Sequence, residues 1–364
     1  MRKYKICVYG IAKNEEKFIS RFMDSVQDAD WVVVGDTGSM DQTVELLRSR
    51  GALVYDVSLN PFRFDQARNA VLDKIPQEAD ICISVDMDEV LSPGWREALE
   101  NVWTPDCTQG LFLYNWSFAP DGTPEIQYWY QKIHARHAYR WLYPVHEVLD
   151  YVGEAPEKII KVPHFILNHY PDPQKSRSFY LDLLQLAVKE APTPRNLHYL
   201  GREYMYAQRY AESITVLQQY LNHPAALWDE ERSASMRFIA RDFQAQENLL
   251  QAIVWFKKAI QETPWLREPY VELALLYYHW QHFAPALFYC EKALEIPSKS
   301  FDYINESNAW DATPYDIAAI SCHHLHLKEK ALFYSEKALE KAPWDERLQK
   351  NHQIYLREKN QPTQ

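Results

Sequence analysis

Residues 81–90 read Ile-Cys-Ile-Ser-Val-Asp-Met-Asp-Glu-Val, an apolar run of strand length that ends in three acids. A continuous apolar run favours a strand buried on both faces of a helix-covered sheet. Ligands of open α/β sheets bind at the carboxyl ends of such strands. Asp86 and Asp88 lie two residues apart, so one turn can direct both carboxylates at a hard cation such as Mg²⁺ or Mn²⁺. The alternative is that these acids cap the next helix and face water.

Three further apolar segments upstream alternate with helical patterns. Residues 5–9, 31–35 and 52–57 have strand character, and short links join them to the helices. This alternation predicts a parallel α/β sheet with right-handed crossovers. All carboxyl ends of a parallel sheet fall on one edge, which would collect the polar residues Asn14, Glu15, Asp36, Asp86 and Asp88.

The composition restricts the class of protein and of partner. The 364-residue chain is 47% hydrophobic, which predicts a globular protein of two domains. Its formal net charge is −11 and it has no basic tract, which argues against nucleic-acid and anionic-membrane partners. The five scattered cysteines form no Cys-x-x-Cys pair, which predicts reduced thiols in a cytoplasmic protein. We expect no membrane span, because no apolar run reaches the required length.

Four pieces of the first half share the order and spacing of the motifs of a known enzyme family. They are Ala12-Lys13-Asn14-Glu15-Glu16, Val34-Gly35-Asp36-Thr37-Gly38-Ser39-Met40-Asp41-Gln42-Thr43, Ala67-Arg68-Asn69 and Asp86-Met87-Asp88-Glu89. Over roughly residues 4–170 the chain resembles the family 2 glycosyltransferases, which have the nucleotide-sugar-binding fold called GT-A. The resemblance implies that Glu15 and Asp36 hold the base and ribose of the nucleotide, with Ala12 and Asn14 lining the site.

The same resemblance implies a metal site. In that family the Asp-x-Asp pair holds a metal that bridges the diphosphate, and here this pair is Asp86 and Asp88. Arg68 is then placed to meet uracil or phosphate. The expected cofactors are Mn²⁺ or Mg²⁺ and a UDP-sugar donor, because a cation neutralises the charge that develops on a diphosphate leaving group. The alternatives are a solvated turn acid for Asp36 and an exposed helix face for Arg68.

Residues 140–149, Arg-Trp-Leu-Tyr-Pro-Val-His-Glu-Val-Leu, resemble the Val-His-Glu signature of the lipopolysaccharide-core branch of that family. Inverting transfer needs one base to take the proton of the acceptor. By this resemblance Glu147 is the base and His146 orients it or substitutes for it. His169, in a segment like the His-x-Tyr end of that branch, is a candidate third metal ligand. The alternatives are a salt-bridged surface Glu147 beside a half-buried His146, and a core-satisfied His169.

The second half has helical periodicity and an internal repeat. Ala252 and Ala286 lie 34 residues apart, as do Ala259 and Ala293. This is the tetratricopeptide pattern, a helix–turn–helix unit of ~34 residues. Gaps of 39 residues (213 to 252) and 45 residues (286 to 331) imply insertions, the longer across residues 297–314. Residues of an earlier and a later copy bring the total to four: Gly201, Tyr204, Ser213 and Leu217, then Ala319, Ala331, Ala338 and Pro343.

The resemblance implies a GT-A domain over residues 1–172, and the repeat pattern predicts an all-α tetratricopeptide solenoid over residues 173–364. The principal hypothesis is a metal-dependent, inverting glycosyltransferase that moves a sugar from a UDP-sugar to a peptide, protein or glycan acceptor. The alternative is a non-catalytic tetratricopeptide adaptor with a vestigial sugar-nucleotide-binding domain. A sugar nucleotidyltransferase would need a glycine-rich, basic loop, which residues 10–14 do not provide. The concave surface of the repeats is expected to dock the acceptor or form a homodimer.

Overall fold

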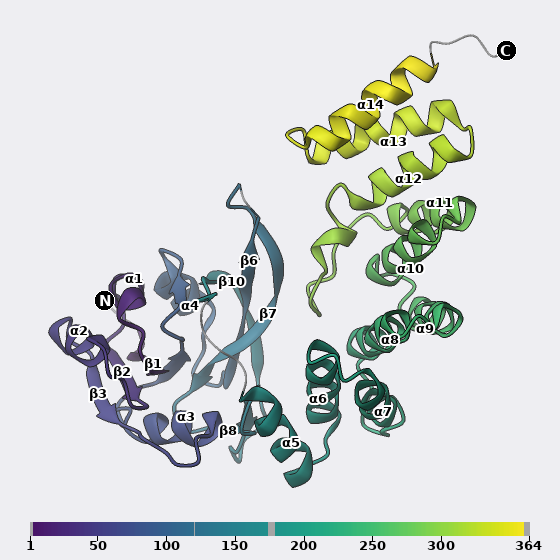
Figure 1. Cartoon of the computed structure of the whole chain (residues 1–364). Coiled ribbons are helices and arrows are strands. Elements are labelled where there is room, and N and C mark those ends of the chain that lie inside the picture. The colour runs from purple at the N-terminus through teal and green to yellow at the C-terminus, as the bar shows by residue number, and fades with distance from the viewer. Residues whose placement is uncertain (1–2, 120, 174–178, 360–364) are drawn as a thin grey trace. The chain divides into compact units, whose positions relative to one another are not determined.

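The computed structural model describes residues 3–119, 121–173 and 179–359. The chain divides into two compact units, Met1–Pro192 and Thr193–Gln364 (Figure 1). The first is a mixed-sheet unit with helices, and the second is helical throughout its described part. This arrangement agrees with the predicted order of an α/β domain followed by helical repeats.

An eight-stranded sheet forms the first unit, in the order β3-β2-β1-β4-β7-β6-β10-β5. The predicted strands form its parallel part, in which β1 pairs with β2 and β4, and β2 pairs with β3. Their bounds are β1 Ile6–Ala12, β2 Trp31–Asp36, β3 Leu53–Asp56 and β4 Ile81–Ser84. The predicted parallel pairing of these segments is confirmed.

The remaining strands make the sheet mixed. β7 runs antiparallel to both β4 and β6, while β10 runs parallel to β6 and antiparallel to β5. The strands are β5 Glu89–Leu91, β6 Gln109–Phe118, β7 Pro124–Ala135 and β10 Ile159–His169. A separate two-stranded sheet pairs β8 (Tyr139–Leu142) with β9 (Val148–Tyr151). The parallel strands are therefore only one part of the sheet, because the later aromatic strands join it by antiparallel pairing.

Helices cover both faces of the parallel strands. Ile6 and Val8 of β1 pack into a core with residues of α1, α2 and α4, whereas Cys7 and Tyr9 pack into a second core with residues of α3. Successive side chains of a strand point to opposite faces, so burial of all four explains the continuous apolar run of β1. The helices are α1 Glu16–Ser25, α2 Thr43–Ser49, α3 Phe64–Leu72 and α4 Trp95–Val102.

Helix α5 (Tyr180–Glu190) belongs to the first unit. The ring of Tyr180 lies 5.9 Å from that of Phe64, and Glu190 forms an ion pair with Arg63 at 2.7 Å. Because of these contacts the unit extends to residue 192, whereas the sequence pattern predicts a boundary between residues 172 and 173.

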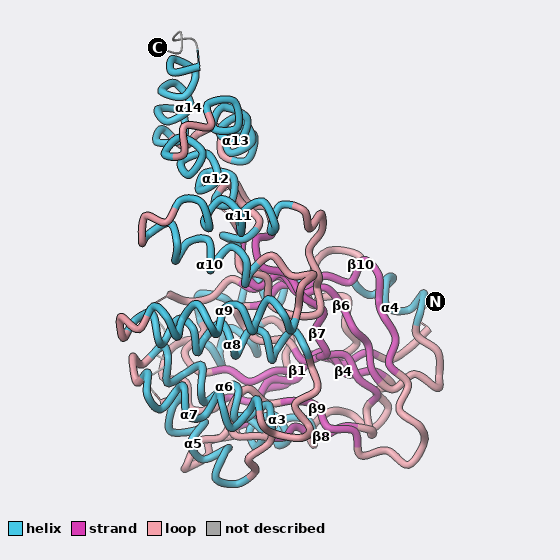
Figure 2. Tube along the Cα trace, turned by 90° about the vertical axis from the view of Figure 1, so that its right-hand side faces the viewer, coloured by secondary structure: helices cyan, strands magenta, loops and turns pink. Residues whose placement is uncertain are grey.

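Residues 193–359 form four helical hairpins and a final helix, which Figure 2 shows as a stack of helices. The hairpins are α6 (Pro194–Tyr206) with α7 (Tyr210–Leu221), α8 (Asp229–Ala245) with α9 (Leu249–Glu262), α10 (Glu268–His279) with α11 (Phe283–Leu294), and α12 (Thr313–His324) with α13 (Lys328–Lys341). Helix α14 (Glu346–Lys359) follows, and a 3₁₀ turn η1 (Ser307–Ala309) precedes α12. The four predicted repeats are thus four tetratricopeptide-like hairpins.

The turn inside each hairpin repeats one backbone geometry. A residue with φ between +57° and +60° lies in every turn, and the next residue donates its N–H to the carbonyl five residues earlier. This is the Schellman type of helix ending. The positive-φ residues are Gln208, Glu247, Gln281 and His326, whose separations of 39, 34 and 45 residues equal those of the sequence repeat. Within the described chain, no helix combines the length and the apolar character that a membrane crossing requires.

Candidate functional site

The candidate site lies at the edge of the sheet where β1, β2 and β4 end. The strand register pairs Ala12 with Asp36 and Tyr9 with Ser84, which lies two residues before Asp86. The polar residues at these strand ends therefore share one edge, as the predicted parallel sheet requires. Their hydrogen bonds form two groups, one after β1 and β2 and the other after β4.

The first group joins the loops after β1 and β2. Asn14 accepts a hydrogen bond from the backbone N–H of Met40 at 2.8 Å, and its own N–H donates to Ser39 Oγ at 3.0 Å. Asn14 has φ +56°, a left-handed conformation that asparagine tolerates better than most residues. Asp36 accepts from the backbone N–H of Ser39 at 3.1 Å, and Glu15 is only 6% exposed. These contacts hold the two loops together.

The second group centres on Asp86, whose two carboxylate oxygens both meet cations. One oxygen accepts from Arg68 Nη2 at 2.8 Å and the other from Lys132 Nζ at 3.0 Å. Desolvation opposes ionisation of Asp86, but the charges of Arg68 and Lys132 outweigh it and hold the pKa of this carboxyl below its usual range. Arg68 also stacks on Trp141 at 5.1 Å. The structure thus places Arg68 on an acid of its own chain.

Lys132 connects Asp86 to a second acid, Glu89. Lys132 Nζ lies 2.9 Å from Glu89 Oε1, which also accepts from the hydroxyl of Tyr114 at 2.8 Å. Both Lys132 and Glu89 are almost fully buried. Burial, together with the negative charges of Asp86 and Asp88, raises the pKa of Glu89, against the opposing effect of Lys132.

Glu147, the predicted base, lies at the other end of this chain of charges. Its Oε1 accepts from Arg68 Nε at 2.5 Å, and its side chain is 12% exposed. The neighbouring His146 has φ +49° and packs edge-on against the ring of Tyr180 at 5.9 Å. The order Glu147–Arg68–Asp86–Lys132–Glu89 alternates in sign, so each of the three acids contacts at least one of the two cations. We call these five residues the sheet-edge network.

Asp88 and His169 form a separate pair next to this network. Asp88 Oδ2 lies 3.6 Å from His169 Nε2, and the other ring nitrogen of His169 lies 3.1 Å from the carbonyl oxygen of Trp116. Burial disfavours the charged imidazole, but the carboxylate of Asp88 outweighs that effect and raises the pKa of His169. The pair is thus an acid and a histidine that stabilise each other.

The predicted metal ligands do not converge on one point. Within residues 3–119, 121–173 and 179–359, no group of three or more His, Cys, Asp or Glu side chains is placed to hold a metal ion. Both oxygens of Asp86 point at cations of the protein, whereas Asp88 pairs with His169. Asp86, Asp88 and His169 therefore do not form one three-ligand site together, and only Asp88 and His169 lie near each other without a lysine or arginine between them.

Sequence reasoning assigned no role to Lys132 or Glu89. Lys132 lies in β7 after three aromatic residues, at a position that faces the interior. A lysine on the buried face of a strand predicts an acidic partner, because an unpaired charge there would be costly. This signal was present in the sequence, although it could not identify the partner.

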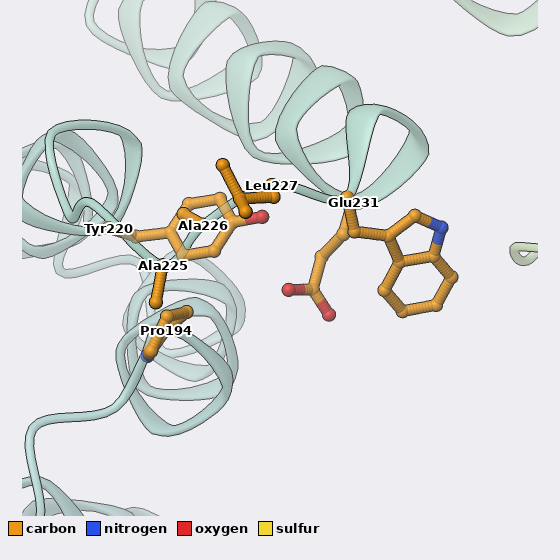
Figure 3. Close-up of a pocket in the computed structure, with 7 residues that line it drawn as sticks. Pro194, Tyr220, Ala225, Ala226, Leu227 and Glu231 are labelled. Atoms are coloured by element: carbon orange, nitrogen blue, oxygen red, sulfur yellow. The ribbon is translucent and has the colours of Figure 1, made fainter.

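Two pockets of the structure are lined by residues that do not belong to this edge. A pocket of about 470 Å³ in the repeat unit is lined by Pro194, Tyr220, Ala225, Ala226, Leu227, Trp228 and Glu231. Figure 3 shows Tyr220 and Glu231 facing its interior from different helices. A second pocket, of about 570 Å³, includes Asp30, Trp31 and Val32 at the start of β2, the end opposite Asp36. Neither contains a predicted site residue.

Comparison with known proteins finds similarity in about half of the chain. No family model and no curated protein matches it. A crystal structure of MamA is 20% identical with a TM-score of 0.37, over 47% of this chain and 95% of that one. PilF of Pseudomonas aeruginosa (16%, TM-score 0.37) covers 49% of this chain and 72% of its own. PilW, a type IV pilus biogenesis factor, has 16% identity and a TM-score of 0.38 over 46% of this chain and 72% of its own.

These comparisons correct the principal hypothesis. MamA, PilF and PilW are tetratricopeptide-repeat proteins, and none of these named matches is a glycosyltransferase. The predictions that the chain belongs to family 2 of the glycosyltransferases, and that it transfers a sugar, are therefore wrong. The strand-end motifs on which the resemblance rested are present, but the edge they form is filled by ion pairs within the chain. What the chain shares with these proteins is a helical repeat.

Proposed function

We propose that this protein is a tetratricopeptide adaptor, which docks protein partners on its repeat unit. The observation that supports this most strongly is the regularity of the four hairpins, whose turns share one geometry and keep the register of the sequence repeat. Stacked hairpins of this kind present an extended surface suited to binding peptides or a second copy of the chain. A protein that acts as an adaptor requires no catalytic group.

Exposed apolar side chains at equivalent repeat positions support this proposal. Val254, Phe288 and Phe333 each lie two residues after the small residue that marks the second helix of their repeat. They are 44%, 52% and 52% exposed, respectively. Exposed apolar surface is typical of sites of protein contact, and these three side chains recur on the second helices α9, α11 and α13 of successive repeats.

The test is site-specific photo-crosslinking of the full chain in cells. A photoreactive phenylalanine derivative replaces Phe288 or Phe333, and in a control it replaces Met40 of the first unit, which is 90% exposed. We expect discrete protein adducts from the repeat positions and not from Met40, with saturable binding once the captured partner is purified. An adduct with a second copy of this chain would identify the partner as a homodimer. Equal adducts from all three positions, or none from the repeat positions, would contradict the adaptor proposal.

We also propose that the first unit retains a capacity to bind a divalent cation and a sugar nucleotide without transferring the sugar. The proximity of Asp88 to His169 favours this second candidate, since both are groups that Mn²⁺ accepts as ligands. Binding through Asp88 and His169 would leave Asp86 paired with Arg68 and Lys132. Calorimetric titration with MnCl₂ and UDP, on the native chain and on Asp88→Asn, tests it. Heat of binding that is identical in both proteins, or absent from the native chain, contradicts the proposal.

We place the adaptor in a reducing compartment, in agreement with a cytoplasmic location. Cys7, Cys82, Cys107, Cys290 and Cys322 are all free and buried. Burial raises the pKa of Cys82 to about 12, so this thiol stays protonated and unreactive at neutral pH. These cysteines behave as small apolar core residues.

A further inference from the structure

The connection between the third and fourth hairpins is longer than the repeat requires. The 45-residue interval from Ala286 to Ala331 exceeds the 34-residue repeat by 45 − 34 = 11 residues. The additional length lies in residues 297–312, here called the strap, between α11 and α12. Figure 1 shows this segment leaving α11, descending past α10, and returning to α12. The strap is therefore folded back onto earlier hairpins.

The first anchor of the strap is Tyr303, which reaches the first hairpin. Its hydroxyl is hydrogen-bonded to His198 Nε2 of α6 at 2.9 Å. Its ring lies 5.3 Å from that of Trp228, next to the start of α8, and packs against the core that contains Phe238. The aromatic side chain thus lies between the first and second hairpins.

Two more anchors reach the second and third hairpins. Glu306 accepts from Arg241 of α8 at 2.9 Å. The indole N–H of Trp310 donates to Glu268 of α10 at 2.9 Å, and the guanidinium of Arg267 lies 4.1 Å from the Trp310 ring. Along the strap the contacts therefore pass in order across α6, α8 and α10.

These three helices are the first helices of successive hairpins, and we call their shared surface the first-helix face. It is rich in guanidinium groups. The Nε atoms of Arg202 and Arg237 are buried and have no hydrogen-bond acceptor among the described residues. The strap meets it with an aromatic ring, a carboxylate and a second aromatic ring, spaced as Tyr303, Glu306 and Trp310.

We propose that the first-helix face is a binding surface of its own, that its ligand is an extended peptide carrying an acid between two aromatic residues, and that the strap is a built-in competitor for this surface. The proposal rests on the adaptor function, and it adds to the second-helix positions Val254, Phe288 and Phe333 a further surface with its own ligand chemistry and regulation. A strap tethered by a short linker acts at an effective concentration of about a millimolar. A free peptide binds only the fraction of molecules whose strap is displaced, so its apparent affinity falls by that fraction.

The probe is a fluorescein-labelled synthetic peptide with the sequence of residues 300–311, Ser-Phe-Asp-Tyr-Ile-Asn-Glu-Ser-Asn-Ala-Trp-Asp. Binding to the full chain is measured by fluorescence anisotropy. The double variant Tyr303→Ala/Trp310→Ala, which removes two anchors of the strap, is expected to bind the peptide at least ~10-fold more tightly than the native chain. Asp302→Ala is the matched control, because Asp302 is exposed and its side chain contacts Ser300 within the strap. This control should bind like the native chain.

Two further measurements keep the proposal falsifiable. A peptide with glutamine in place of its glutamate should bind the double variant roughly 10-fold more weakly, since a hydrogen bond to a charged group is lost. If the double variant fails to fold, hydrogen exchange on the native chain replaces it, and excess peptide should then accelerate exchange of the strap amides. Equal binding by both folded proteins, or strap exchange unchanged by peptide, would overturn the proposal. Photo-crosslinking adducts at Phe288 or Phe333 in that case would leave the adaptor function intact.

Discussion

The two units each bury a series of alternating charges, and the two series differ in what completes them. In the sheet-edge network all five residues come from strands, a helix and loops of the first unit, and Lys132 is the cation that Glu89 contacts. In the repeat unit Glu272 lies between Arg237 and Arg241, and Glu306 of the strap contacts both arginines from outside. The sheet-edge network draws all its charges from the regular elements and loops of the first unit. The network of the repeat unit takes one of its acids, Glu306, from the inserted strap.

This difference bears on function. A buried ion pair contributes little net stability, but loss of one partner leaves the other charge buried and uncompensated. The sheet-edge network therefore cannot give up a member easily, which is the behaviour of a structural element. Glu306 is 32% exposed, so an acid of another molecule can take its place. The comparison thus separates a permanent network from one that can exchange a member.

The largest expected effect is at Lys132. Lys132→Met should lower the free energy of unfolding of the first unit by about 3–5 kcal/mol, because Asp86 and Glu89 both lose a cation in a buried site. Hydrogen exchange of the core strands β1 and β4 measures this. Lys158→Met is the control, since Lys158 is 47% exposed in its pair with Asp106; no measurable change is expected there. Equal effects of the two substitutions would show that the sheet-edge network is not structural.

The second effect tests the same principle in the repeat unit. Arg237→Met should destabilise that unit by about 2–3 kcal/mol, less than Lys132→Met does in the first, because Glu272 keeps Arg241 as a partner. The double variant Arg237→Met/Glu272→Met should recover part of the loss, since both buried charges are then removed. Urea unfolding of the full chain, followed by hydrogen exchange of α8 and α10, measures both. If Arg237→Met lowers the free energy of unfolding as much as Lys132→Met does, the two networks do not differ in how they tolerate the loss of a cation.

The sequence predicts the fold better than the site, for a physical reason. Hydrophobic period and repeat spacing are local properties, and they placed β1 to β4 and all four hairpins correctly. The antiparallel part of the sheet depends on pairing between distant strands, such as β4 with β7, which the pattern of one strand does not specify. The strap is a similar case, because its length is visible in the sequence but the face it covers is not.

The strand-end residues illustrate the limit for function. The parallel sheet brings Asp36 and Asp86 to one edge, as the sequence predicts. Which group neutralises each acid depends on side chains from other elements, and Lys132 reaches Asp86 from β7. The same acids fit either a metal site or an ion-pair network, so their spacing alone could not decide between the two.

The third prediction concerns a buried acid outside the exchangeable network of the repeat unit. Burial raises the pKa of Asp242 to about 7, with Ser213 and Arg241 opposing the shift. The folded-state pKa lies above the ordinary value of 3.8, so the contribution of Asp242 to stability is full below pH 3.8 and is lost as pH rises through about 7. Asp242→Asn should therefore be more stable than the native chain at pH 8, by about 1 kcal/mol or more, and similar to it at pH 4.

Thermal unfolding of both proteins at the two pH values checks this sign. Glu336→Gln, which removes an exposed acid of α13, is the control and should not change the pH dependence. The stability difference between the native chain and Asp242→Asn is the quantity to compare at pH 4 and pH 8. If this difference is the same at both pH values, Asp242 ionises in the folded state at little cost and the prediction is wrong.

The smallest effect is expected at the pair of Asp88 and His169, which lies beside the sheet-edge network. The raised pKa of His169 gives stability that is full below its ordinary pKa of 6.5 and is lost as pH rises through the folded-state value. Asp88→Asn should move the His169 titration, followed by NMR, to lower pH, whereas Asp106→Asn, at a distant exposed acid, should not. Mg²⁺ gives the decisive comparison, because a metal ligand must be deprotonated. If Mg²⁺ lowers the titration of His169 in the native chain and not in Asp88→Asn, the pair holds a cation; if it changes neither, the pair belongs with the sheet-edge network as a structural contact.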